Sequence, residues 1–139
     1  MPLWAGCGAM CMFALIPTKE IMSVSRSIAE WTTDKYEAAV DLARRMTDYI
    51  KANEPDTLIF EWFGDEETGR VLWYQEYRDD EAFLTHAQNM VEQGFREETF
   101  QVLAFDRVVL LTPAKHPTVK EMVQQPGFVK LQGIAGVVR

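Results

Sequence analysis

Histidine and glutamate are the residues in this 139-residue chain whose types could support acid–base chemistry. His86 falls on the apolar stripe of a predicted helix, near Met90. An imidazole there is predicted to act as a general base, or as a hydrogen-bond donor to a ligand oxygen. The alternative is a histidine that belongs to the hydrophobic core and has its hydrogen bonds made within the protein. The second histidine, His116, precedes a proline and is interpreted as a surface residue.

Two glutamates, Glu61 and Glu76, lie in the middle of predicted strands. A carboxylate is costly to bury there without a partner. Glu76 is therefore predicted to pair with His86 or, across the sheet, with Arg26. Paired with His86, it would orient the imidazole, and the two would form the catalytic group. An exposed or cross-strand-paired carboxylate is the alternative for both glutamates.

Other chemistries lack the residues that they need. Cys7 and Cys11 do not have the C-x-x-C spacing of zinc and redox sites, and no second Cys or His pair accompanies them. The sequence contains no nucleophile motif, phosphate loop or dinucleotide fingerprint. No metal and no cofactor are therefore predicted.

Charge and apolar content limit the partners that we expect. The net charge is −7, and no lysine- or arginine-rich block is present, so nucleic-acid binding is not expected.

Residues 1–17 are apolar but shorter than the ~20 residues of a membrane span. Three interpretations of them stay open: an arm or extra strand, an atypical export signal, or an over-extended start with the natural one at Met22. A cytoplasmic protein without a membrane partner is expected.

Periodicity predicts the elements that must position these residues. A hairpin is indicated most clearly, because a polar loop with a glycine near each end separates two aromatic and β-branched runs. Helical spacing with start and stop signals occurs on both sides of the hairpin. The predicted elements are a strand over 23–31, a helix over 34–52, strands over 58–63 and 71–77, a helix over 81–94 and a strand over 100–111.

This β-α-β-β-α-β order predicts an α+β, ferredoxin-like domain over residues 21–113, with a four-stranded antiparallel sheet and two helices on one face. The other face also carries apolar residues, so a homodimer through this open sheet face is predicted. An N-terminal arm, 1–20, precedes the domain. A C-terminal extension, 114–139, is predicted to contain a short helix and a fifth strand, and to pack on the domain or on a partner subunit.

The predicted sheet also offers space for a ligand. Ser25, Ser27 and Ala29 share one face of the first strand, and such small side chains leave room opposite them. Aromatic residues are frequent on the strands. Core and dimer packing explain most of them, and the alternative is an aromatic-lined pocket for a flat ligand.

One stretch resembles a known family. The pattern E-P-D-T-L-x-x-E-W, a short turn and Y-x-E-Y-x-D-x-E-A-F-x-x-H-A resembles the antibiotic biosynthesis monooxygenase family of dimeric α/β barrels. It is carried by Glu54, Pro55, Leu58, Glu61, Trp62, Tyr74, Glu76, Tyr77, Asp79, Glu81, Ala82, Phe83 and His86. The resemblance covers the four strands and two helices, and excludes residues 1–20. It implies a pocket inside each protomer, between the sheet and the helices.

The resemblance also implies candidate functions and site residues. The first is a cofactor-independent monooxygenase that oxidises a quinol or polyphenol-type aromatic molecule, with His86 and Glu76 as catalytic residues. Its predicted substrate-binding residues are Trp31, Trp62, Tyr74, Phe83 and Met90. The alternative is a non-catalytic ligand-binding or stress-response barrel. A haem-degrading relative is disfavoured, because the asparagine that such relatives use has no clear counterpart here.

Overall fold

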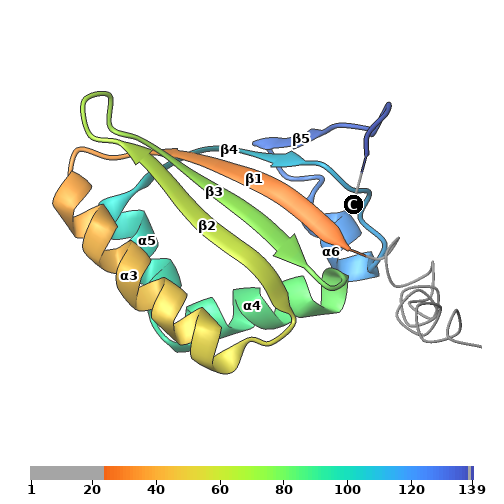
Figure 1. Ribbon diagram of the computed structural model, residues 1–139, viewed down its shortest axis with the longest axis horizontal. Coiled ribbons are helices and arrows are strands. Elements are labelled where there is room, and N and C mark those ends of the chain that lie inside the picture. Colours follow the sequence, from red (N-terminus) through yellow and green to blue (C-terminus); the bar gives the residue numbers. More distant parts are fainter. Residues whose placement is uncertain (1–23, 138) are drawn as a thin grey trace, which may run out of the picture.

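The computed structural model describes residues 24–137 and 139, so the predictions for residues 1–20, for Cys7 and Cys11 and for a start at Met22 lie outside the described residues. The α+β class and the β-α-β-β-α-β order are confirmed (Figure 1). The elements are β1 (Ser25–Thr32), α3 (Tyr36–Asn53), β2 (Thr57–Asp65), β3 (Arg70–Tyr77), α4 (Asp80–Glu92), α5 (Phe95–Val102), β4 (Ala104–Leu110), α6 (Pro117–Met122) and β5 (Phe128–Lys130).

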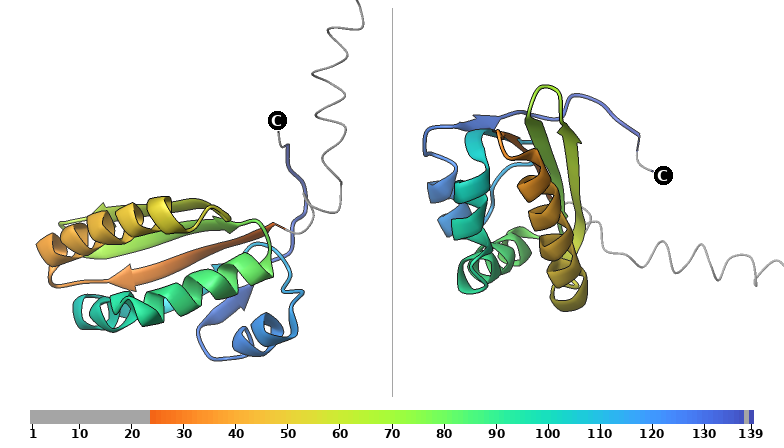
Figure 2. Two further views of the ribbon diagram at one scale, coloured as in Figure 1. Left: turned by 90° about the horizontal axis from the view of Figure 1, so that it is seen from below. Right: turned by 90° about the vertical axis from the view of Figure 1, so that its left-hand side faces the viewer.

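The sheet has the strand order β2-β3-β1-β4-β5. The predicted antiparallel four-stranded sheet is present, since β1 pairs with β3 and β4, and β2 pairs with β3. The fifth strand, β5, runs parallel to β4 and makes the sheet mixed. Helices α3 and α4 lie on one face of this sheet (Figure 2). That face and the helices enclose the core, whose buried side chains include Leu42 and Met46 on α3.

The strand predicted over 100–111 is wrong in its first part. Residues Phe95–Val102 form the helix α5, and the strand begins only at Ala104. The alternation of Phe100, Gln101 and Val102 is too short to distinguish a strand from a helix. Tertiary contacts favour the helix, because Glu98 in its first turn binds Arg45 of α3.

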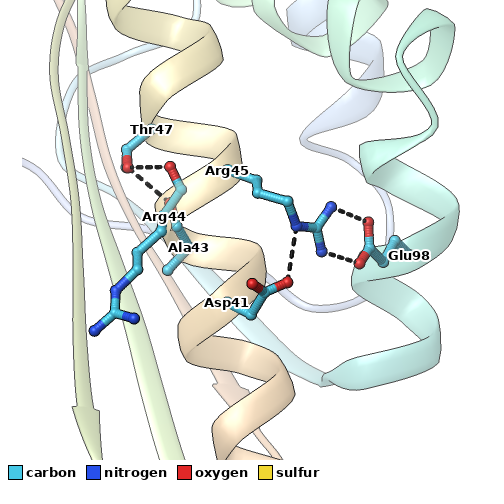
Figure 3. A network of polar contacts seen from close by, with 6 residues as sticks. All are labelled: Asp41, Ala43, Arg44, Arg45, Thr47 and Glu98. Atoms are coloured by element: carbon cyan, nitrogen blue, oxygen red, sulfur yellow. Dashed lines mark hydrogen bonds and ion pairs between the residues drawn. The ribbon is translucent and has the colours of Figure 1, made fainter.

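A polar network connects α5 to α3 (Figure 3). Both terminal nitrogens of the Arg45 guanidinium donate to the Glu98 carboxylate, and Arg45 Nε donates to Asp41 at 2.8 Å. These hydrogen bonds hold the pKa of Glu98 below its usual range. Exposed ion pairs of this kind add little stability, but the paired, planar geometry fixes how α5 lies against α3.

The C-terminal extension lies against α4 and β4. Val119 of α6 is buried, and β5 pairs with β4. The buried carboxylate of Asp80, in the first turn of α4, accepts hydrogen bonds from the backbone N–H groups of Lys115 (2.6 Å) and His116 (2.8 Å). His116 in turn accepts a hydrogen bond from the N–H of Thr118 and so caps α6. We call the Asp80 contact the Asp80 clasp.

Removing the Asp80 clasp is expected to loosen the extension. Asp80→Ala removes the acceptor of two partly buried N–H groups, which we expect to cost about 1–3 kcal/mol of unfolding free energy for the two hydrogen bonds together. Amide hydrogen exchange of Lys115 and His116 should speed up. Glu81→Ala, an exposed change in the same helical turn, is the control. Unchanged exchange in Asp80→Ala would show that the clasp does not hold the extension.

Candidate functional site

A cavity of about 260 Å³ lies between the sheet and the helices α4 and α6. We call it the sheet–helix cavity. Its walls are largely apolar, and its polar side chains are few, as is typical of small-molecule sites. The residues that line it are Ser25, Ser27, Ala29, Trp31, Trp73, Gln75, Phe83, His86, Ala87, Met90, Arg96, Val108, Leu110, Val119, Met122, Val123 and Phe128.

His86 is the ionisable group in the buried part of this wall. Only 5% of its surface is exposed, and its ring lies 5.1 Å from Phe60 and 5.4 Å from Tyr77, between ring centroids. Its Nδ1 lies 2.8 Å from Oε1 of Glu54, which is itself buried. The two side chains form a buried histidine–carboxylate pair, the His86–Glu54 pair.

The end of α3 places Glu54. Proline disfavours the α conformation in the residue before it, so Pro55 ends the helix, and Glu54 has a non-helical backbone with φ −124° and ψ 76°. The Glu54 carboxylate also accepts hydrogen bonds from Thr57 Oγ1 at 2.8 Å and from Asn89 Nδ2 at 3.1 Å. Asn89 lies one helical turn after His86, so both reach the same carboxylate.

Opposing effects act on the Glu54 carboxyl. Burial, the largest effect, raises the pKa of Glu54. The hydrogen bond and electrostatic attraction of His86, together with the hydrogen bonds from Asn89 and Thr57, outweigh burial and lower that pKa below its usual value. Glu54 is therefore ionised at neutral pH and accepts the proton of Nδ1–H. This fixes the tautomer of His86 and leaves Nε2 as the nitrogen available to a ligand.

A second polar group is held in a similar way. The hydroxyl of Tyr77, which is fully buried, donates to Oε1 of Gln75 at 2.6 Å. Burial, followed by the negative charge of Glu54, raises the pKa of Tyr77 well above its usual value, so it stays a donor. With its oxygen engaged, Gln75 has its NH₂ group free to donate to a ligand in the cavity.

Four of the predicted site residues meet at the sheet–helix cavity: Trp31, Phe83, His86 and Met90. Trp62 lies on the same face of the sheet but not in the cavity wall. It packs against Trp73 at 4.8 Å between ring centroids and borders a different hollow beside α3. Its predicted role in binding therefore does not fit the structure.

The pairing of Glu76 with His86 is wrong. Alternation along β3 places Trp73, Gln75 and Tyr77 on the helix face, so Tyr74 and Glu76 lie on the open face. There Tyr74 donates to Glu76 at 2.8 Å, and Glu76 lies opposite Arg26 in the register. Burial and the Glu76 carboxylate raise the pKa of Tyr74. Neither residue reaches the sheet–helix cavity.

Sequence reasoning missed Glu54, Gln75 and Arg96. Glu54 carried a signal, because it belongs to the family-like pattern and precedes a proline, but its position at a helix end suggested only a helix stop. Gln75 alternates with Glu76 on β3, and the face of the sheet that each occupies depends on packing. Arg96 lay in a stretch interpreted as a polar link, and only the helix α5 brings it to the cavity rim.

A more open groove of about 620 Å³ lies on the C-terminal extension, beside α6 and β5. Its ionisable side chains are two lysines, Lys120 and Lys130, with no residue suited to acid–base work at neutral pH. Within the described ranges no cluster of three or more His, Cys, Asp or Glu side chains could hold a metal ion. None of the described helices is long and apolar enough to cross a bilayer.

Comparison with solved structures identifies the fold as that of the antibiotic biosynthesis monooxygenases. MupZ from Pseudomonas fluorescens aligns with a TM-score of 0.71 at 13% identity, over 84% of this chain and 94% of MupZ. SnoaB, a cofactor-independent oxygenase from Streptomyces nogalater, aligns with a TM-score of 0.56 at 9% identity, over 68% of this chain and 97% of SnoaB.

A candidate antibiotic biosynthesis monooxygenase from Caulobacter crescentus gives a TM-score of 0.58 at 16% identity, over 68% of this chain and 92% of its own. The match to MupZ thus covers more of this chain than these two matches do. No protein-family model and no curated protein matches the sequence. At such identities the similarity establishes the fold, and the chemistry must be argued from the site.

Proposed function

We propose that this protein is a cofactor-independent monooxygenase that oxidises a small quinol or polyphenol in the sheet–helix cavity. The His86–Glu54 pair carries the proposal. It presents an imidazole nitrogen to an apolar cavity, with a carboxylate behind it to fix the tautomer and to stabilise the protonated ring. SnoaB, which shares the fold, is described as a cofactor-independent oxygenase.

The proposed reaction needs no external reductant. His86 Nε2 takes the phenolic proton, and the phenolate then gives an electron to dioxygen. Superoxide joins a hydrogen-bearing ring carbon ortho to that oxygen, and the peroxide receives the proton from His86. His86 next removes the hydrogen of that carbon, the O–O bond breaks, and the departing hydroxide leaves with this proton as water. The carbon becomes a carbonyl, and the ring supplies all four electrons.

The size of the cavity narrows the substrate. About 260 Å³ lies below the ~300–1,000 Å³ of pockets that hold drug-sized ligands. A one-ring phenol therefore fits this volume better than a fused polycyclic aromatic does. The walls from α6 and β5, which include Met122 and Phe128, would cover its apolar face and exclude water from the reacting carbon.

Oxygen uptake tests the proposed function. The full chain, with a chelator and without added cofactor, should consume one O₂ per product formed from at least one member of a panel of one-ring quinols. With ¹⁸O₂, one labelled atom should enter the product and the other should enter water. Quinols oxidise slowly in air, so boiled protein is the control. Tight binding without uptake above that control would contradict the proposal and favour a non-catalytic ligand-binding barrel.

We also propose that the open sheet face pairs with a second copy of this chain. By strand alternation this face carries apolar side chains from four strands: Ile28, Ile59, Phe63, Leu72, Tyr74 and Val109. An apolar face of this kind on a soluble chain calls for a cover. Sedimentation should show a dimer that Leu72→Arg converts to a monomer, whereas Gln88→Arg, on the exposed side of α4, should not. A monomeric wild type would contradict this proposal.

A further inference from the structure

The wall of the sheet–helix cavity contains a positively charged side chain and no negatively charged one. Among the residues that line it, Arg96 is the one charged side chain besides the titratable His86, and no carboxylate belongs to the wall. This contrasts with the chain as a whole, whose net charge is −7. An arginine at the rim of a cavity whose wall holds no carboxylate offers a site for an anion.

Arg96 is also free to bind such an anion. Within the part of the chain that the structure describes, no carboxylate pairs with it, whereas Arg45, Arg70 and Arg107 each pair with a glutamate. Its guanidinium carbon lies 6.0 Å from the ring centroid of Phe100, which limits where the charge can go. Because the Arg45–Glu98 contact fixes α5, the first turn of α5 holds Arg96 at the rim.

We infer that the ligand of the sheet–helix cavity is a small aromatic carboxylate, whose carboxylate pairs with Arg96 at the rim. Its ring lies between the aromatic wall formed by Trp31 and Trp73 and the apolar side chains of the C-terminal extension. A guanidinium matches a planar carboxylate in geometry as well as in charge. The inference rests on the proposed function in taking the ring to be a phenol whose hydroxyl reaches His86.

Ligand affinity measured under argon tests the inference, because the proposed reaction cannot proceed without dioxygen. We would titrate the full chain calorimetrically with 2,5-dihydroxyphenylacetate and with its neutral amide. The carboxylate should bind about 10- to 100-fold more tightly than the amide, the range expected for a hydrogen bond to a charged group. This preference should weaken as salt is added, because Arg96 is exposed.

Arg96→Gln should abolish the preference for the carboxylate and leave the affinity for the amide nearly unchanged, and Arg96→Lys should retain part of the preference. Arg44→Gln is the matched control, because Arg44 is also exposed and projects from α3 away from Glu98 (Figure 3). Equal affinities for both probes, or an equal loss in Arg44→Gln, would overturn the inference. Failure of both probes to bind would also overturn the inference.

Oxygen uptake separates this inference from the proposed function. Carboxylate binding that depends on Arg96 but is followed by no oxygen uptake in air would uphold the binding site and reject the oxygenase. Uptake with 2,5-dihydroxyphenylacetate, below saturation, that is equal in wild type and in Arg96→Gln would uphold the oxygenase and overturn the inferred ligand class.

Discussion

His86→Gln is expected to lower the rate of oxygen uptake about 10²- to 10⁴-fold, the usual contribution of a positioned general base. The glutamine amide can still donate a hydrogen bond to Glu54, so the fold should persist, but an amide cannot take the phenolic proton. The loss should therefore appear in kcat, with little change in ligand affinity measured under argon. Initial rates in an oxygen electrode, combined with calorimetric affinities, measure both quantities.

The control for this variant is in the same chain. His116→Gln makes the same chemical change at the cap of α6, away from the cavity wall, and should leave the rate of oxygen uptake unchanged. A His86→Gln protein that folds, binds and keeps the wild-type rate would show that His86 is a structural residue. The His86–Glu54 pair would then serve to hold α4 against the end of α3.

Glu54→Ala is expected to have the largest effect on stability. It removes the acceptor of His86, Thr57 and Asn89 at one buried position, and breaking a buried pair of this kind costs about 3–5 kcal/mol of unfolding free energy. Glu54→Gln keeps the shape and one acceptor oxygen, so it should cost less. Because it removes the charge that fixes the Nδ1–H tautomer, its kcat should still fall. Urea unfolding measures the change in unfolding free energy.

The same pair predicts how stability depends on pH. The pKa of Glu54 is lower in the folded state than in the unfolded chain, so its contribution is present above the unfolded value of about 4.3 and is lost as pH falls through the folded value. Wild type should therefore lose more stability than Glu54→Gln on acidification below about pH 5. Glu61→Gln, at an exposed position on β2, should follow wild type. Parallel curves for wild type and Glu54→Gln would contradict the pairing.

Much of the fold could be predicted from the sequence because its signals are local. The turn of the hairpin requires a glycine, and this glycine can be recognised in the sequence. Gly69 has φ 73°, and a Cβ there would lie 2.3 Å from the carbonyl oxygen of Thr33. Asp79 accepts a hydrogen bond from the N–H of Ala82, as an aspartate directly before a helix is expected to do. By contrast, the apolar residues of α5 show only a weak helical periodicity. The formation of this helix depends on the contact between Glu98 and Arg45.

The candidate site could be predicted only in part, because it depends on which face of the sheet is covered. Alternation correctly separated Tyr74 and Glu76 from Trp73 and Gln75, but both faces carry aromatic residues, and the wrong set was assigned to the pocket. The partner of His86 was also missed. Glu54, at the end of α3, and His86, on α4, are 32 positions apart in the sequence, and no local pattern encodes the contact between them.

Nitrogen NMR of the imidazole rings tests the central claim most directly, because the chain has only two histidines and His116 serves as an internal reference. Under argon, the neutral form of His86 should carry its proton on Nδ1 and leave Nε2 unprotonated. Addition of 2,5-dihydroxyphenylacetate should shift the Nε2 resonance of His86 and leave Nδ1, bound to Glu54, nearly unchanged. An Nε2 resonance that does not respond to a ligand shown to bind would contradict the assignment of His86 to the site.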